Sequence, residues 1–137
     1  MTELVIDASV ALAWCFRDER TEATAGLLER VQTDAAAVPS LWHLEVANVL
    51  ALAERRGRIT PAESAELIAL LEMLEIDGET SVRAFTRVLD HAREERLTAY
   101  AAAYLELAMR LGNPLASKDA DLCDAAERLG VSVLRAA

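Results

Sequence analysis

The segment LTAYAAAYLELAMRLGNPLASKDADL, residues 97–122, contains a helix, a turn and a strand in direct succession. Thr98 can accept a hydrogen bond from the N–H groups of the first helical turn, and Gly112, followed by Asn and Pro, ends the helix. The apolar run at 114–116 then predicts a short strand, which delivers Asp119 just beyond its carboxyl end. In an open α/β sheet, ligands bind at that end of the strands.

A second strand is predicted at the start of the chain. Leu4–Ile6 is an apolar run without polar alternation, which is typical of a strand buried on both faces of a parallel sheet. Asp7 follows at once, and Asp7 or Ser9 can cap a helix over ASVALAWCF. The chain therefore opens with a strand that leads directly into a helix.

The rest of the chain alternates helical and strand patterns. Helices are predicted at 22–32, 41–56, 62–74 and 81–95, with a last one from Asp119 or Asp121 to 129, and strands at 36–38, 75–77 and 131–134. This alternation favours a parallel sheet covered by helices on both faces. The predicted fold class is α/β, a three-layer α/β/α sandwich with a central parallel sheet of four to five strands, and residues 1–137 are expected to form one domain.

Two of these helices are unusually apolar. The helix at 41–56 carries apolar residues around most of its circumference, which predicts that it is largely buried: Leu44, Val46, Ala47, Val49, Leu50 and Leu52. The helix at 62–74 is expected to turn four apolar side chains inward: Leu67, Ile68, Leu70 and Leu71. Together they hold more apolar residues than one face of a sheet needs.

Charge limits the classes of function. The chain of 137 residues has a formal net charge of −9, which argues against binding nucleic acid through a generally basic surface. A nuclease that works through metal ions stays possible, because it needs a carboxylate cluster of its own. The arginines within 55–58 and 93–96 could contact phosphate, and each group could equally complement the dipole at a helix C-terminus.

No uncharged apolar run is long enough to cross a bilayer, and the first residues lack the pattern of an export signal. Cys15 and Cys123 fall on predicted helices without metal-binding spacing, so free buried thiols are expected at both positions. These features predict a cytoplasmic protein that does not associate with membranes.

Three acidic residues are candidates for a common site. Asp7 follows the first strand, Asp119 follows the strand at 114–116, and Glu45 lies near the start of the helix after the second strand. Loops at the carboxyl ends of parallel strands open on one edge, so these acids can converge. Gathered carboxylates repel one another unless a divalent cation neutralises them, and oxygen ligands favour Mg²⁺ or Mn²⁺. Such a site suggests phosphodiester hydrolysis.

Simpler roles remain open for each of these residues. Asp7 and Asp119 can serve only as N-caps, and Glu45 can pair with an arginine. Tyr100 and Tyr104, one helical turn apart, are expected to be core aromatics with satisfied hydroxyl groups. Neither histidine of the chain has a partner at metal-ligand or catalytic spacing.

Several motifs, in this order, resemble those of PIN-domain ribonucleases of the VapC toxin family: LVIDASV at 4–10, PSLWHLEVANVL at 39–50, the segment 97–122 and the terminal GVSVL. The resemblance implies a PIN-like fold, with Asp7, Glu45 and Asp119 as metal-binding acids and with Ser9 and Ser117 as polar supports. It also implies a Mg²⁺-dependent endoribonuclease, in which Mn²⁺ can substitute, acting as the toxin of a type II toxin–antitoxin pair.

The resemblance further implies the partners of the chain. They are an RNA substrate, a second copy in a homodimer, and a VapB-type antitoxin whose C-terminal segment covers the site. A heterotetramer or larger assembly would form with the antitoxin, and DNA would be contacted only through it. The apolar helices at 41–56 and 61–74 are candidates for the surfaces involved.

One position departs from the family pattern. The family helix usually reads TAYDAAYLELA, and Ala101 stands where that pattern has an active-site Asp. As the third residue of a helix capped by Thr98, position 101 would also favour an acidic side chain, because of the exposed N–H groups and the helix dipole. We expect reduced or absent activity with an intact fold, since alanine is a good helix former. We also expect that the parental chain carries Asp there.

Two alternatives come from other classes of function. Receiver domains and haloacid-dehalogenase-type phosphatases also place acids at strand ends, but Ala8 and Ser9 stand where their second acid is expected. A PIN domain without catalytic activity, retained for antitoxin binding and DNA-bound autoregulation, is the other alternative, and Ala101 supports it.

Overall fold

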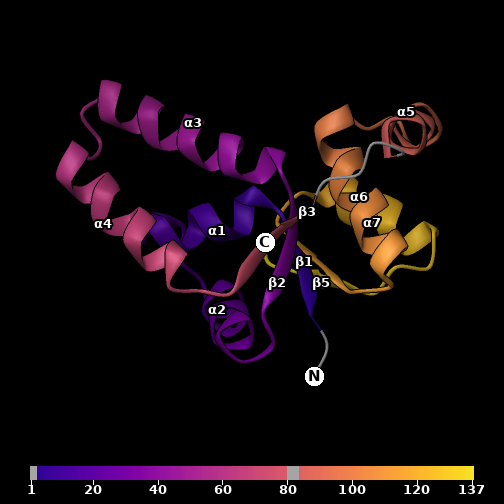
Figure 1. Cartoon of the computed structure of the whole chain (residues 1–137), viewed down its shortest axis with the longest axis horizontal. Coiled ribbons are helices and arrows are strands. Elements are labelled where there is room, and N and C mark those ends of the chain that lie inside the picture. The colour runs from indigo at the N-terminus through magenta and orange to yellow at the C-terminus, as the bar shows by residue number, and fades with distance from the viewer. Residues whose placement is uncertain (1–2, 80–83) are drawn as a thin grey trace.

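A computed structural model describes residues 3–79 and 84–137. Its five strands form one parallel sheet in the order β3-β2-β1-β4-β5 (Figure 1). They are β1 Leu4–Ile6, β2 Ala36–Pro39, β3 Ile76–Glu79, β4 Leu115–Ser117 and β5 Val133–Arg135. The chain runs from β1 outward to β3 and then resumes on the other side of β1 with β4. The order of strands therefore reverses between β1 and β4, which is where open α/β sheets bind ligands.

Seven helices and a short 3₁₀ turn are present in the described residues. They are α1 Ala8–Cys15, η1 Arg17–Glu19, α2 Glu22–Asp34, α3 Leu41–Arg55, α4 Pro61–Glu72, α5 Ala84–Glu95, α6 Ala99–Leu111 and α7 Ala120–Arg128. Figure 1 shows α1 to α4 on one side of the sheet and α5 to α7 on the other. The predicted three-layer α/β/α sandwich is confirmed. The helix start that we expected at Ser81 lies outside the described residues.

The two helix boundaries predicted for the segment 97–122 are confirmed. The Thr98 side chain accepts a hydrogen bond from the N–H of Ala101 at 3.1 Å, and Gly112 ends α6 in the left-handed conformation with φ 66°. Glycine reaches that conformation without the penalty that a Cβ atom imposes. Local side-chain chemistry therefore sets both ends of α6.

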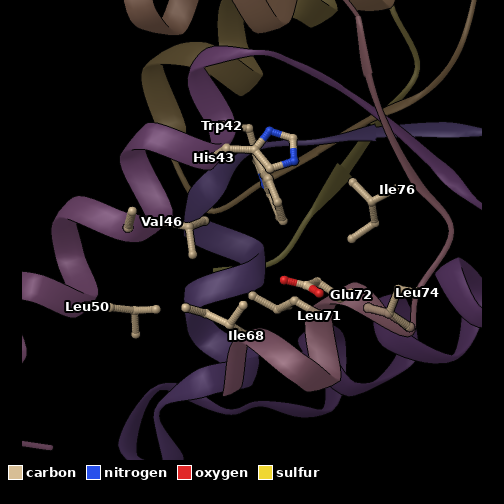
Figure 2. A pocket seen from close by; sticks show the side chains of 10 residues that line it. Trp42, His43, Val46, Leu50, Ile68, Leu71, Glu72, Leu74 and Ile76 are labelled. Atoms are coloured by element: carbon tan, nitrogen blue, oxygen red, sulfur yellow. The ribbon is translucent and has the colours of Figure 1, made fainter. Parts of the chain in front are cut away.

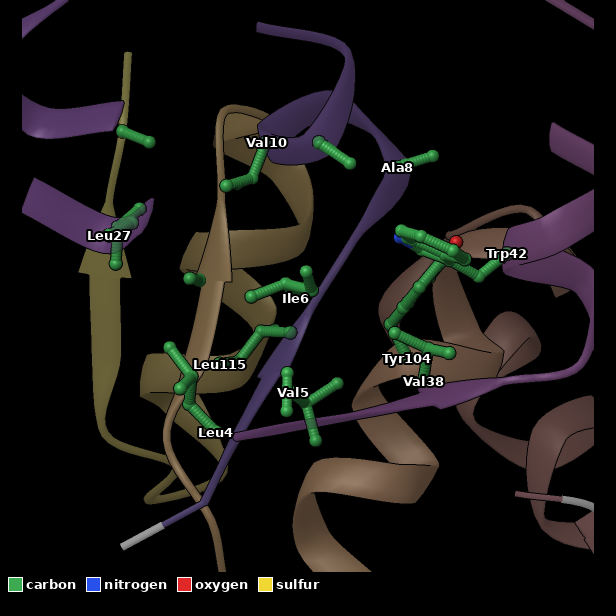
Figure 3. Packing of buried hydrophobic residues seen from close by; sticks show 14 of the residues in the cluster. Leu4, Val5, Ile6, Ala8, Val10, Leu27, Val38, Trp42, Tyr104 and Leu115 are labelled. Carbon is green, nitrogen blue, oxygen red and sulfur yellow. The ribbon is translucent and has the colours of Figure 1, made fainter. Parts of the chain in front are cut away.

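The core lies between the sheet and its two helical layers. All three residues of β1, Leu4–Ile6, are fully buried because helices cover both faces of this central strand. Figure 3 shows Leu115 of β4 beside β1, and it shows Val38, Trp42 and Tyr104 grouped on the β2 side. Each fully buried aliphatic side chain contributes roughly 1.5–3 kcal/mol relative to an exposed one. The buried strand β1 therefore fixes the position of Asp7, which directly follows it at the edge of the sheet.

The prediction that α3 is largely buried is wrong. Its buried side chains form a single stripe, which includes Val46 and Leu50, whereas Leu44 is 74% exposed. The expectation for α4 is also wrong in part, because Ile68 and Leu70 are exposed. Figure 1 shows α3 and α4 diverging from their connecting turn, so that each is covered on one side only.

The helix α5 also leaves apolar side chains exposed. It packs against α6, but its Phe85 and Leu89 are exposed and its Val88 is half-buried. None of the helices in the part of the chain described here combines the length and the apolar character that a bilayer span requires.

Candidate active site

Asp7 leaves the carboxyl end of β1 and is the N-cap of α1. It is buried, with 6% of its surface exposed. Its Oδ1 accepts hydrogen bonds from the Ser9 hydroxyl at 2.5 Å and from the Val10 N–H at 3.4 Å. Its Oδ2 accepts a hydrogen bond from the hydroxyl of Ser117, at the end of β4. Both oxygens of the buried Asp7 carboxylate therefore accept hydrogen bonds within the protein.

The two serines connect the loops that follow β1 and β4. The Ser9 hydroxyl oxygen accepts a hydrogen bond from the N–H of Lys118 at 3.0 Å, and that of Ser117 accepts one from the N–H of Asp119 at 2.9 Å. Each hydroxyl thus donates to Asp7 and accepts from the backbone of the β4 loop. We call this set of residues, Asp7, Ser9, Ser117, Lys118 and Asp119, the switch-edge network.

Asp119 is the N-cap of α7. Its Oδ1 accepts hydrogen bonds from the N–H groups of Asp121 at 3.0 Å and Leu122 at 3.3 Å. The N-cap interpretation is therefore confirmed for Asp119, as it is for Asp7. Its Oδ2 accepts no hydrogen bond from the described residues, so capping leaves one oxygen for a ligand.

Glu45 lies in the second turn of α3 and is half-buried. Its Oε1 accepts a hydrogen bond from the hydroxyl of Tyr104 on α6, so its partner is a tyrosine rather than the arginine we considered. Tyr104 is a buried core aromatic with a satisfied hydroxyl, which confirms that expectation. Tyr100 is 65% exposed, and the same expectation is wrong for it. The reason is that α6 is enclosed only from Ala102 onward.

The pKa values link these acids electrostatically. Burial raises the pKa of Asp7, the two serine hydroxyls and the Val10 N–H oppose this, and the charge of Asp119 raises it further. Burial also raises the pKa of Tyr104, and the hydrogen bond and charge of Glu45 add to this, followed by the charge of Asp7. Asp119 thus acts on Asp7, and Asp7 and Glu45 both act on Tyr104, so the negative charge at this end of the sheet favours a cation.

The donor set suits a hard divalent cation. All three candidate ligands supply oxygen atoms, which Mg²⁺ prefers, and Mg²⁺ commonly keeps several water ligands beside one or two carboxylates. Within residues 3–79 and 84–137, no three His, Cys, Asp or Glu side chains form a ready cluster for a metal ion. Asp7 and Asp119 lie at the same edge of the sheet, whereas the Glu45 carboxylate accepts a hydrogen bond from Tyr104.

Ala101 occupies the third position of α6 and is half-buried against the core. It precedes Tyr104 by three residues, so the two lie on the same side of the helix, one turn apart. Position 101 thus lies on the same side of α6 as the tyrosine that contacts Glu45, and an acidic side chain there would add negative charge to this side of the helix.

The basic groups that we considered for phosphate lie at helix ends. Arg55 is in the last turn of α3 and Arg93 in that of α5. Arg58 contacts Asp18 at 2.6 Å, and its guanidinium lies 4.0 Å from the centre of the Phe16 ring. The Arg58 guanidinium thus already forms an ion pair with Asp18 and contacts the Phe16 ring.

The remaining expectations concern the cysteines and one missed contact. Cys15 and Cys123 are both free, as expected, and Cys123 is buried, whereas Cys15 is only half-buried, so the expected burial is wrong for Cys15. The pairing of Tyr104 with Glu45 was not foreseen.

The chain is an open α/β domain in which acidic residues follow two parallel strands, at the point where the strand order reverses. Domains of this class bind ligands at that point. Residues 4–128 match the PIN domain family, and the chain belongs to that family, whose members are generally nucleases and typically depend on divalent metal ions.

Two solved structures resemble the chain. PAE2754 from Pyrobaculum aerophilum has a TM-score of 0.72 and 25% sequence identity, over 97% of this chain and 84% of that one. FitAcB from Neisseria gonorrhoeae has a TM-score of 0.68 and 15% identity, over 96% of each chain, which is a likeness of fold alone. No curated protein sequence matches.

Proposed function

We propose that this chain is a VapC-type toxin of a type II toxin–antitoxin pair, built as a metal-dependent endoribonuclease. The observation that carries the proposal is the switch-edge network, in which the buried carboxylate of Asp7 is held by Ser9 and Ser117 at the same edge as Asp119. A nuclease needs such acids in fixed positions before a metal ion arrives, since preorganised ligands lower the cost of binding.

Asp7, Asp119 and Glu45 would hold Mg²⁺, and Mn²⁺ could substitute. A bound Mg²⁺ lowers the pKa of a water molecule and stabilises the leaving oxygen of a phosphodiester. Ser117 fixes the orientation of Asp7 through Oδ2, and Ser9 does so through Oδ1. The raised pKa of Asp7 would fall again beside a cation, so metal binding and ionisation of this carboxylate support each other.

Ala101 should impair this activity, and we propose that the parental chain carries Asp at this position. The test is cleavage of total cellular RNA by the chain and by its Ala101→Asp variant, each with Mg²⁺ and with EDTA, followed by mapping of the cut ends. We expect cleavage by the variant that EDTA abolishes, and little or none by the Ala101 form. Ala101→Asp combined with Asp7→Asn is the control for a contaminating nuclease. Equal cleavage by both forms would count against the assignment of position 101.

The second candidate is an inactive PIN domain that acts through binding and through DNA-bound autoregulation by its antitoxin. Ala101 is the observation that favours it. If the Ala101→Asp variant cleaves no RNA while the chain still binds an antitoxin, this alternative replaces the enzyme.

Partner binding is supported by apolar grooves on both sides of α4. One, of about 450 Å³, lies between α3 and α4 and is lined by Trp42, Val46, Leu50, Ile68 and Leu71, among others (Figure 2). The other, of about 470 Å³, lies between α4 and the first two helices. We propose that these surfaces serve the homodimer and a VapB-type antitoxin in a heterotetramer or larger assembly, in the cytoplasm. Light scattering after size-exclusion chromatography measures the stoichiometry.

A further inference from the structure

Glu45 is the candidate metal ligand that stands apart from the switch-edge network, and one hydrogen bond connects it to the rest of the site. Its partner, Tyr104, is 59 positions away in the sequence and lies on the opposite side of the sheet, on α6. We propose that Tyr104 is a positioning residue, whose hydroxyl holds the Glu45 carboxylate at the acidic edge for metal binding. This inference rests on the metal-dependent function proposed above.

The tyrosine is well suited to hold another side chain. Its ring is buried, with 3% exposed, and Figure 3 shows it in the core beside Trp42 and Val38. A buried tyrosine has little rotational freedom, whereas a half-exposed glutamate can adopt many rotamers. The hydrogen bond from the Tyr104 hydroxyl therefore restricts the rotamers of the Glu45 side chain.

The direction of this hydrogen bond is fixed. A carboxylate offers only acceptor oxygens, so the Tyr104 hydroxyl donates and Glu45 accepts. The donation uses Oε1 of Glu45. Its Oε2 accepts no hydrogen bond from the described residues and stays free for a cation or a metal-bound water.

The position of Tyr104 joins the two halves of the site. Its hydroxyl contacts Glu45 on α3, and its helix α6 packs against β1, the strand that Asp7 follows. It also follows Ala101 by one turn on the same helix, where the family pattern has its further acid. One rigid helix, α6, therefore presents both position 101 and the group that orients Glu45.

A purely structural role would give the same contact, because the bond also ties α3 to α6 across the sheet. The two roles differ in what they predict for metal affinity. A structural tie changes the free energy of unfolding and leaves the affinity of the folded protein for metal unchanged, whereas a positioning residue changes that affinity. Loss of a group that orients a metal ligand typically weakens affinity by about 10–100-fold.

The test measures Mn²⁺ binding by titration calorimetry and by electron paramagnetic resonance, using the full chain with Ala101→Asp as the parent. Tyr104→Phe removes the hydroxyl and keeps the ring, and we expect it to weaken Mn²⁺ binding by about tenfold or more with an unchanged circular dichroism spectrum. Tyr100→Phe is the matched control, since Tyr100 lies on the same helix and is exposed, and it should bind Mn²⁺ as the parent does.

A double-variant cycle tests whether Tyr104 acts through Glu45. In a Glu45→Gln background, Tyr104→Phe should cause no further loss of Mn²⁺ affinity. Should Tyr104→Phe fail to fold, the parent and the variant are both measured in a stabilising osmolyte such as sucrose, which favours the folded state.

Unchanged Mn²⁺ affinity in folded Tyr104→Phe would overturn the inference while leaving the proposed function intact. An equal loss with and without Glu45→Gln would also overturn it, since Tyr104 would then act by another route. Absence of Mn²⁺ binding in the parent itself would refute the metal-dependent function, and the inference with it.

Discussion

Replacement of Ser117 by alanine tests whether the switch-edge network stabilises the fold in addition to orienting the acidic side chains. The Ser117 side chain is fully buried, donates to Oδ2 of Asp7 and accepts from the N–H of Asp119. Ser117→Ala therefore leaves a buried carboxylate oxygen and a backbone N–H without partners, while it removes almost no apolar contact.

The size of the effect follows from these two losses. A hydrogen bond to a charged group contributes about 1.5–3 kcal/mol, and a buried donor left unpaired costs about 1–3 kcal/mol. We expect the free energy of unfolding to fall by about 3–5 kcal/mol at pH 7, which for a chain of this length lowers Tm by roughly 10–20 °C. Urea unfolding followed by circular dichroism measures the first quantity, and calorimetry the second.

A matched serine is available as the control. Ser40 is the N-cap residue of α3, but its side chain makes no capping hydrogen bond and is exposed. Ser40→Ala should change the free energy of unfolding by less than about 0.5 kcal/mol. A loss below about 1 kcal/mol in Ser117→Ala would refute the reasoning, because the network would then add nothing beyond an ordinary surface contact.

Two further predictions concern Asp7 and Ala101. Because the folded-state pKa of Asp7 is raised above its ordinary value of 3.8, its stabilising contribution is fully present below that value and is lost as the pH rises through the folded pKa. The stability of Asp7→Asn relative to the parent, from urea unfolding at several pH values, should therefore improve as the pH rises from 3 to 7, and a constant difference would contradict this. Mn²⁺ should raise the Tm of the Ala101→Asp variant clearly more than that of the Ala101 form, since the added carboxylate increases metal affinity and ligand binding stabilises the folded state; equal shifts in thermal denaturation would argue against a missing ligand.

Local signals in the sequence predicted the elements well. Thr98 and Gly112 mark the ends of α6 through short-range hydrogen bonds and backbone preference, so their effect can be read without the rest of the chain. The buried strand Leu4–Ile6 was predicted for a similar reason, since strands of a parallel sheet lack polar alternation. The approach of Asp7 to Asp119 followed from the topology of parallel strands alone.

Contacts between distant elements were not predictable in the same way. An apolar pattern gives the surface that a helix can bury but not what covers it, so Leu44 and Leu70 were expected inside and are exposed. The Tyr104 to Glu45 bond joins helices on opposite sides of the sheet, and no local pattern encodes such a pairing. The role of Glu45 as a metal ligand stays a prediction.

The switch-edge network also affects when the site can form during synthesis. Asp7 directly follows the first strand, yet one of its two hydroxyl donors, Ser117, is 110 positions further along the chain. At the usual elongation rate, a ribosome needs roughly 5–20 s to add that stretch. Throughout this interval the nascent chain holds Asp7 without Ser117 and without Asp119, so a partly made chain has no complete acidic edge. The order of strands thus delays assembly of the site until β4 has been made and has docked beside β1.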